Sequence, residues 1–526
     1  MLRNIFISFL LILSVSAYAE RDKNHKCSFQ TLATMKSKAE KGDVVELHNM
    51  GIHYRYGYCS YLQDKSKAIG CYDKAAVRGY VPSIKELITL HYSNKDYSKT
   101  REWCNKMLEI NEYDAEAYYY LALCEEKEGK VCVGNCALAA MYGNKYAMNK
   151  LGCIYYEGKL YREAYEAWVK AWCSESDETI TNNLIYCCLL PGIGCEKDYI
   201  AAARVYKLCY YDNKNYDKHA SDWNKVKVAA DAGDAKACYA WYILNEDKKY
   251  FEKALAAKVP DALFEKELET REIYGFSDDE EEKVEAVYQM AMKNKWYAPL
   301  IYWAADVLFG NQNAPAVRVL IDGGNKAFTD LPVLNQDMFL HILTAHNEFN
   351  FYWEFIYPEI EGEEYNGTKE EKIDALKYYQ QTAEVVYESG ICKGASILSW
   401  INSEENLIPG SIGKAFKYAS IATNMEEEPD NPNLISYGAG ALTSAYVLGK
   451  CYYEGKGAKK NRVAALSYLL GSERNEAKAL LNRIYRMAPL SKEAGVVQDI
   501  SLADYYLSES SKSGAELLER LKAGSR

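Results

Sequence analysis

The stretch Leu448-Gly449, followed by Tyr452-Tyr453-Glu454-Gly455, repeats the stretch Leu151-Gly152, followed by Tyr155-Tyr156-Glu157-Gly158. In both copies a tyrosine comes three residues after the first glycine, and a helical pattern rich in small residues comes next. Self-similarity of this kind is typical of solenoids, in which each helical hairpin completes the core of its neighbour. The sequence therefore predicts an all-α fold, an α-α superhelix of stacked hairpins.

A looser copy of the same phrase lies near the N-terminus, with Met50-Gly51, Tyr54 and Gly57. The glycine inside the first helix allows two helix backbones to approach closely, so a large residue at Gly51 is expected to wedge the pair apart. A further unit has its turn at Gly192, 34 residues after Gly158, which suits two short helices and two turns.

Repeat strength varies along the chain and suggests four segments. The expected organisation is a signal peptide at 1–19, a cysteine-rich repeat solenoid at 20–260, a degenerate helical block at 261–367, and a C-terminal helical region at 368–526 with a repeat at 441–477 and a capping helix near 514–522. The cap is expected because an open-ended solenoid needs a polar outer face.

The N-terminus has the features of an export signal. Arg3 precedes an apolar run from Ile5 to Val15, and the small-x-small triplet Ala17-Tyr18-Ala19 predicts cleavage after Ala19. No later stretch approaches the roughly 20 apolar residues of a transmembrane helix. These features predict a periplasmic or secreted protein without a membrane span.

The net charge argues against nucleic acid as a partner. Removal of Arg3 with the signal leaves 62 basic and 74 acidic residues, a net charge of −12 with histidines neutral. Phosphate binding draws on clustered lysine and arginine side chains, which this balance does not favour.

Tyrosine and cysteine are both unusually frequent. There are 47 tyrosines against 13 phenylalanines, and these rings suit packing between helices or, alternatively, a ligand-binding groove. Of 16 cysteines, 14 lie between Cys27 and Cys238. In an exported protein they favour disulfides, with buried thiols and zinc as alternatives. Their spacing lacks the paired pattern of structural zinc, so neither a metal nor a cofactor is expected.

The phrases around Gly51, Gly152 and Gly449 resemble the Sel1-like repeat, a relative of the tetratricopeptide repeat. The resemblance implies a scaffold whose concave face holds a protein or peptide. Exported cysteine-rich members of that family place two cysteines eight positions apart. Cys124 and Cys132 have this spacing and are the possible disulfide, although they flank a turn inside one hairpin.

No residue pattern predicts catalysis, and we expect a non-enzymatic binding scaffold. The motif Ser411-Ile412-Gly413-Lys414 fits S-x-x-K, but its usual companion motifs are missing and it opens a helix. His341 and His346 are five apart, which places them on different helical faces. Two alternatives stay open: a periplasmic immunity protein that neutralises a delivered toxin, and a β-lactamase-like or penicillin-binding activity sometimes ascribed to cysteine-rich relatives.

Overall fold

The structure is a computed structural model of the 526-residue chain. It describes residues 29–58, 61–174, 177–209, 220–271, 281–310, 331–351, 354–355, 367–403, 410–424, 438–472, 474–487 and 495–508. Every regular element in these ranges is helical, and none is a strand, which confirms the predicted all-α class. The signal peptide and the capping helix expected near 514–522 lie outside the described residues.

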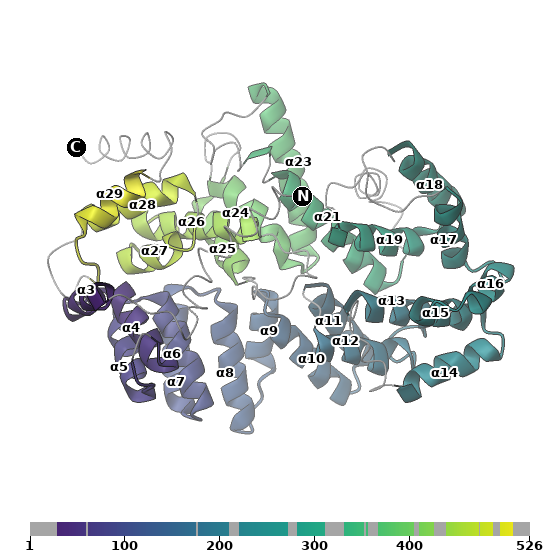
Figure 1. Ribbon diagram of the computed structural model, residues 1–526, viewed down its shortest axis with the longest axis horizontal. Helices are drawn as coiled ribbons and strands as arrows, with labels where there is room; N and C mark the ends of the chain where they lie inside the picture. Colours follow the sequence, from purple (N-terminus) through teal and green to yellow (C-terminus); the bar gives the residue numbers. More distant parts are fainter. Residues whose placement is uncertain are drawn as a thin grey trace. The chain divides into compact units, whose positions relative to one another are not determined.

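The chain divides into two compact units. Unit 1 comprises residues 1–144, 350–430 and 437–526. Its described helices are α3 (Phe29–Glu40), α4 (Val44–Tyr56), α5 (Lys65–Ala76), α6 (Val81–Ser93), α7 (Tyr97–Ile110), α8 (Ala115–Lys127), α9 (Val133–Met141), α23 (Lys369–Glu388), η5 (Cys392–Gly394), α24 (Ala395–Ser403), α25 (Ile412–Thr423), α26 (Gly438–Glu454), α27 (Arg462–Leu469), α28 (Asn475–Arg486) and α29 (Ile500–Ser508) (Figure 1).

Unit 2 comprises residues 145–349 and 431–436, so it is inserted between two parts of unit 1. Its helices are α10 (Lys145–Glu157), α11 (Tyr161–Ser174), α12 (Glu178–Asn182), η1 (Asn183–Leu189), α13 (Tyr199–Cys209), α14 (Ala220–Asp231), α15 (Ala235–Asn245), α16 (Lys248–Ala256), α17 (Pro260–Thr270), α18 (Glu281–Asn294), α19 (Tyr297–Gly310) and α21 (Val333–Phe351), whose last two residues belong to unit 1. This division by packing differs from the four segments expected from repeat strength.

Glycine–aspartate pairs form two of the junctions between helices. Gly42 and Gly233 have φ values of 94° and 97°, a backbone region that a side chain disfavours. The next residue in each case, Asp43 or Asp234, accepts hydrogen bonds from backbone N–H groups in the first turn of the following helix. These pairs therefore end one helix and begin the next.

The repeated glycines inside α4, α10 and α26 mark where paired helices come closest. A Cβ atom at Gly51 would collide with the ring of Tyr72 in α5, and one at Gly152 would collide with the indole of Trp168 in α11. At Gly449 the obstacle is the side chain of Leu469 in α27. Each glycine thus makes room for a large side chain from the second helix of its own hairpin.

The remaining repeat positions lie in turns and at helix edges. Gly57, Gly192 and Gly455 have positive φ values of 72°, 74° and 76°. Gly158 differs, because the residue with a positive φ in that turn is the next one, Lys159, with φ 61°. Helix α11 begins at Tyr161, so the turn of this hairpin is short. Tyr54 and Tyr155 are half-buried, and Tyr452 is 2% exposed.

The Gly51–Tyr72 contact generates a stability prediction. Gly51→Leu should lower the free energy of unfolding by roughly 1–3 kcal/mol or more, because the added side chain needs the space that Tyr72 fills. Gly70→Ala in α5 is the matched control, since nothing lies within 4 Å of a Cβ at that position. There the helix propensity of alanine should raise stability slightly. Urea titrations followed by circular dichroism check both variants; equal midpoints for Gly51→Leu and the parent chain would contradict the packing.

Candidate functional site

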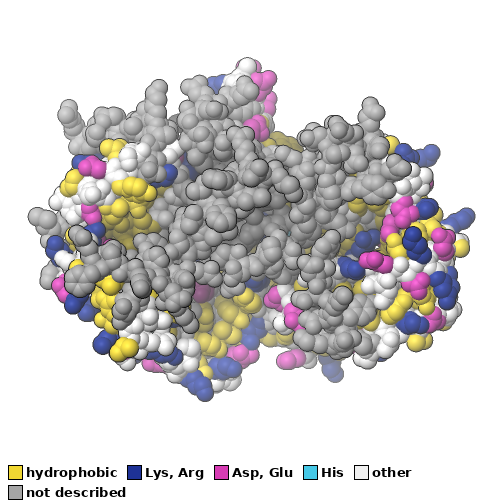
Figure 2. Space-filling model, viewed as in Figure 1, with side chains coloured by type: hydrophobic (Ala, Val, Ile, Leu, Met, Phe, Trp, Pro, Cys, Tyr) yellow, Lys and Arg dark blue, Asp and Glu magenta, His cyan; other side chains and the backbone are white. Residues whose placement is uncertain are grey.

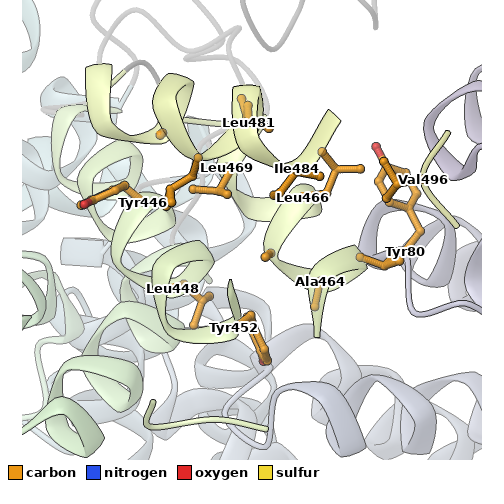
Figure 3. Packing of buried hydrophobic residues seen from close by; sticks show 14 of the residues in the cluster. Tyr80, Tyr446, Leu448, Tyr452, Ala464, Leu466, Leu469, Leu481, Ile484 and Val496 are labelled. Atoms are coloured by element: carbon orange, nitrogen blue, oxygen red, sulfur yellow. The ribbon is translucent and has the colours of Figure 1, made fainter. Parts of the chain in front are cut away.

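The N-terminal and C-terminal repeats of unit 1 share one apolar core (Figure 3). Val44, Leu47 and Tyr80 from the N-terminal helices belong to the same cluster as Leu448, Leu466, Leu469, Leu481, Ile484 and Val496. All of these side chains are at most 6% exposed. The two ends of the chain therefore stabilise each other through burial of apolar surface, the main favourable contribution to folding.

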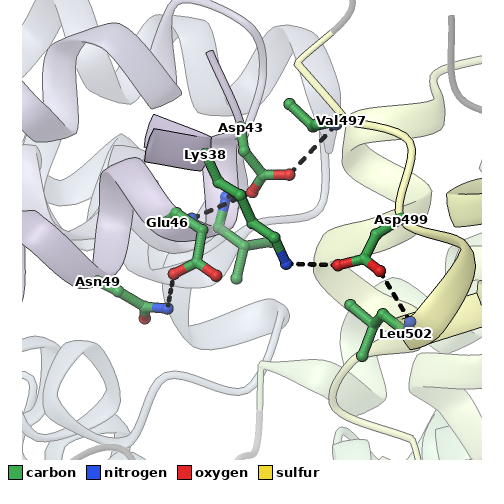
Figure 4. Close-up of polar contacts among 8 residues, drawn as sticks. Lys38, Asp43, Glu46, Asn49, Val497, Asp499 and Leu502 are labelled. Carbon is green, nitrogen blue, oxygen red and sulfur yellow. Dashed lines mark hydrogen bonds and ion pairs between the residues drawn. The ribbon is translucent and has the colours of Figure 1, made fainter. Parts of the chain in front are cut away.

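Polar contacts run along the edge of this shared core (Figure 4). Lys38 in α3 donates to the Asp499 carboxylate at 2.5 Å, a pair separated by 461 residues in sequence. Asp43 accepts a hydrogen bond from the backbone N–H of Val497 at 3.2 Å. The N–H of Val44 donates to the carbonyl oxygen of Gly495 at 2.9 Å. We call these contacts between α3–α4 and residues 495–503 the terminal clasp.

Further hydrogen bonds join the two halves of unit 1 beyond the clasp. The Asn424 amide donates to two carbonyl oxygens, those of Tyr113 at 2.6 Å and Tyr142 at 3.1 Å. The Tyr452 hydroxyl donates to the carbonyl of Ile110. A repeat tyrosine thus packs its ring in the core and uses its hydroxyl to satisfy a backbone group at a helix end.

Burial raises the pKa values of some carboxyl groups at the clasp, whereas pairing with Lys38 lowers that of another. Burial raises the pKa of Asp43 above its ordinary value, although hydrogen bonds from Glu46 and Val497 act against it. Burial likewise raises the pKa of Glu46. For Asp499, burial acts to raise the pKa, but the hydrogen bonds from Lys38 and from the backbone of Leu502, together with the charge of Lys38, outweigh it, so the pKa of Asp499 lies below its ordinary value. Asp499 therefore stabilises the clasp above pH 4, and that contribution is lost as the carboxylate is protonated in acid.

Asp43 accepts hydrogen bonds both from the first turn of α4 and from the clasp, and a matched pair of variants distinguishes the two contributions to stability. It caps α4 and also accepts from Val497, whereas Asp64 caps α5 through Lys67 N and lies outside the clasp. Asp43→Ala should cost about 2 kcal/mol, more than a cap alone. It should also speed amide hydrogen exchange in residues 495–503, whereas Asp64→Ala should leave that segment unchanged. Equal exchange in both variants would contradict the clasp.

The expected disulfide between Cys124 and Cys132 is not formed in the structure. The Cys124 side chain is fully buried and lies near Thr100 and Cys104 of the preceding helix, whereas Cys132 is half-buried at the start of α9. Since Cys124 faces α7, it does not meet its expected partner. Both residues are therefore thiols without a disulfide bond in the structure.

Burial also keeps several thiols protonated. It raises the pKa of Cys195 to about 11 and that of Cys451 to about 12. Such thiols are poor nucleophiles near neutral pH. Within the described part of the chain, no group of three or more histidine, cysteine, aspartate or glutamate side chains is arranged to hold a metal ion.

The residues considered for catalysis lie in ordinary structural positions. Ser411 is the residue before α25, and both its side chain and that of Lys414 are exposed. A further histidine, His48, is half-buried, with Nδ1 2.9 Å from the Ser83 hydroxyl oxygen and its ring against Tyr72. Burial lowers the pKa of His48 to about 4, which makes it a neutral core histidine.

A polar cluster in unit 2 was not anticipated from the sequence. Arg204 of α13 donates to the Tyr239 hydroxyl at 2.8 Å, and its guanidinium lies 5.8 Å from the Tyr239 ring centroid and 6.0 Å from that of Tyr302. Glu265 accepts hydrogen bonds from the hydroxyls of Tyr239 and Tyr242, at 2.5 Å and 2.7 Å. Helices α13, α15, α17 and α19 thus bring charged and aromatic side chains together.

Beside this network are buried polar atoms to which the described residues supply no hydrogen-bond partner. These atoms are Asp261 Oδ1, the Tyr302 hydroxyl and Asn335 Nδ2, on side chains that are 8%, 3% and 3% exposed. The charge of Arg204 and that of Asp198 both act on Asp261. We call Asp198, Arg204, Asp261, Tyr302 and Asn335 the Asp261 cluster. This cluster is hard to predict from sequence, because Pro260-Asp261 is also the ordinary start of a helix.

Two buried carboxyls of unit 2 have strongly shifted titration. Burial raises the pKa of Asp261 to about 6, although Arg204 acts against this shift. Burial also raises the pKa of Asp337 to about 6. A folded-state pKa above the unfolded value means that the folded chain binds protons more tightly, so stability falls as pH rises from about 4 to 6. Well above pH 6 both carboxyls are ionised, and their contribution to the free energy of unfolding is fully lost.

The pH dependence of stability tests this assignment. Between pH 7.5 and 5.0, the free energy of unfolding of the parent chain should increase by about 1–2 kcal/mol more than that of Asp261→Asn, which cannot titrate there. At pH 7.5 the variant should be at least as stable as the parent, because it removes an uncompensated buried charge. Urea titrations followed by tryptophan fluorescence give both quantities. Parallel pH profiles for the two chains would show that Asp261 is ionised normally.

Surface charge and helix length add two further observations. In the described part of the face drawn in Figure 2, basic and acidic side chains are interspersed rather than gathered by sign. Within the described ranges, no helix combines the length and apolar character needed to cross a membrane.

Comparisons with known proteins add a structural similarity. No protein-family model matches the chain, and no curated protein matches it. Among solved structures, the chain is similar to a protective antigen present in uropathogenic Escherichia coli strains, which displays an SLR fold. The identity is 18%, the match covers 93% of each chain, and the TM-score is 0.30.

Proposed function

We propose that this protein is an exported, non-enzymatic scaffold built from Sel1-like helical hairpins, and that it binds another protein or a peptide. The observation that carries the proposal is the Asp261 cluster, where buried polar atoms of unit 2 have no hydrogen-bond partner among the described residues. Buried polar groups in folded proteins are normally hydrogen-bonded, so we expect a bound partner to supply the missing hydrogen bonds.

Unit 1 offers a contrast that supports placing recognition in unit 2. The inner apolar residues of its N-terminal hairpins pack against its C-terminal hairpins, and backbone groups such as the Tyr113 and Tyr142 carbonyls are satisfied from across that core. Those faces are already used for folding. The concave face expected for the partner is therefore proposed for the helices around Asp261.

Affinity capture from the native envelope tests the proposal. The chain carrying a C-terminal tag should recover a discrete protein that binds the purified chain again with defined stoichiometry. Asp261→Asn should recover less of it, while Glu252→Gln, an exposed acid on α16, should recover the same amount. If no protein binds the purified chain again, the scaffold proposal fails.

The immunity-protein alternative is a special case of the same binding activity. It predicts that the captured protein is a toxin, such as a lipase, encoded next to this chain. A partner of another kind would remove this alternative while leaving the scaffold proposal in place.

The enzymatic alternative makes a separate prediction at Ser411. A β-lactamase-like activity would hydrolyse nitrocefin, and the activity would vanish in Ser411→Ala. We expect no turnover in either chain, because the exposed Ser411 and Lys414 open a surface helix. Turnover that depends on Ser411 would overturn the non-enzymatic proposal.

A further inference from the structure

The Asp261 cluster carries more negative than positive charge. In the part of unit 2 that the structure describes, three carboxylates, those of Asp198, Asp261 and Glu265, act together with two basic side chains, Arg204 and the exposed Lys236. Glu265 is engaged by two tyrosine hydroxyls, and the Asp198 carboxylate accepts from two backbone N–H groups of α13. The Oδ1 atom of Asp261 has no such contact. The missing group is therefore one that brings positive charge to Asp261.

The neighbouring polar atoms are compatible with a donor group at the same point. The Tyr302 hydroxyl can accept a hydrogen bond through its oxygen. The Asn335 side chain lies beside that hydroxyl, and rotation of its amide by half a turn would present an oxygen instead of a nitrogen. Three acceptor atoms could then converge on one group with several N–H donors.

We infer that the Asp261 cluster receives a basic side chain, a lysine ammonium or an arginine guanidinium, from the protein or peptide that the chain binds. This inference rests on the proposed function. An anionic ligand would meet the carboxylates, and a water molecule could satisfy the hydrogen bonds but would leave the charge of Asp261 uncompensated.

Two members of the cluster are partly accessible to solvent. Asp261 itself is 8% exposed, whereas Asp198 and Arg204 are half-buried. A long, flexible basic side chain could extend past these two residues while its own backbone stays outside. The rings of Tyr239 and Tyr302, which already face the Arg204 guanidinium, would also favour a second cation by its attraction to aromatic faces.

A displayed library of random 12-residue peptides tests the inference with the full chain as bait. Peptides selected by the parent chain should be enriched at least fivefold in lysine or arginine at one position. Glu252→Gln, which removes one exposed negative charge from the same unit, should select the same peptides. Asp261→Asn and Tyr302→Phe should lose the enrichment, while their circular dichroism melting curves show that both chains are folded.

A double-mutant comparison then ties the basic residue to Asp261. Replacing that residue of the best peptide with norleucine should weaken binding to the parent chain at least tenfold. The norleucine peptide should bind Asp261→Asn and the parent chain equally.

The possible outcomes separate the inference from the proposed function. Two results would overturn the inference and leave the scaffold proposal standing. Either the selected peptides show no preference for a basic residue, or norleucine replacement weakens binding to Asp261→Asn as much as binding to the parent chain. In both cases the cluster would hold ordered water only. If no peptide is enriched over the unselected library, both fail.

Discussion

The close approach of two helices within a hairpin is the constraint on which the rest of the structure depends. Gly51, Gly152 and Gly449 each leave room for a large side chain of the following helix. A Cβ atom at any of them would separate the pair and expose apolar surface that the next hairpin must cover. Because each hairpin buries only part of its own core, this local contact determines whether hairpins can stack at all.

Stacking in unit 1 leads to closure rather than to an open end. The N-terminal hairpins pack against the C-terminal ones, and Lys38, Asp43 and Val44 bond to residues 495–499. An open solenoid end requires a polar cap, whereas here the described N-terminal hairpins of unit 1 pack against its C-terminal hairpins. Unit 2 is inserted in the sequence between two parts of unit 1 and contains the Asp261 cluster.

Sequence reasoning predicted what is encoded locally. The hairpin fold, the turn at Gly57 and the role of Gly51 follow from short-range spacing, because the interacting helices are neighbours in the chain. The clasp could not be predicted, since no pattern relates Lys38 to Asp499 across 461 residues. The Cys124–Cys132 pairing failed because spacing does not show that Cys124 points toward α7. The Asp261 cluster depends on four helices and has no motif of its own.

Zero-length carbodiimide crosslinking followed by mass spectrometry tests whether the N-terminal and C-terminal hairpins of unit 1 pack together. We expect an amide bond between Lys38 and Asp499, formed within a single chain at low protein concentration. The neighbouring pair Lys67 and Asp64, at 3.3 Å, serves as a local positive control. Crosslinking of the local pair without any link between residues 29–56 and 495–508 would contradict the clasp.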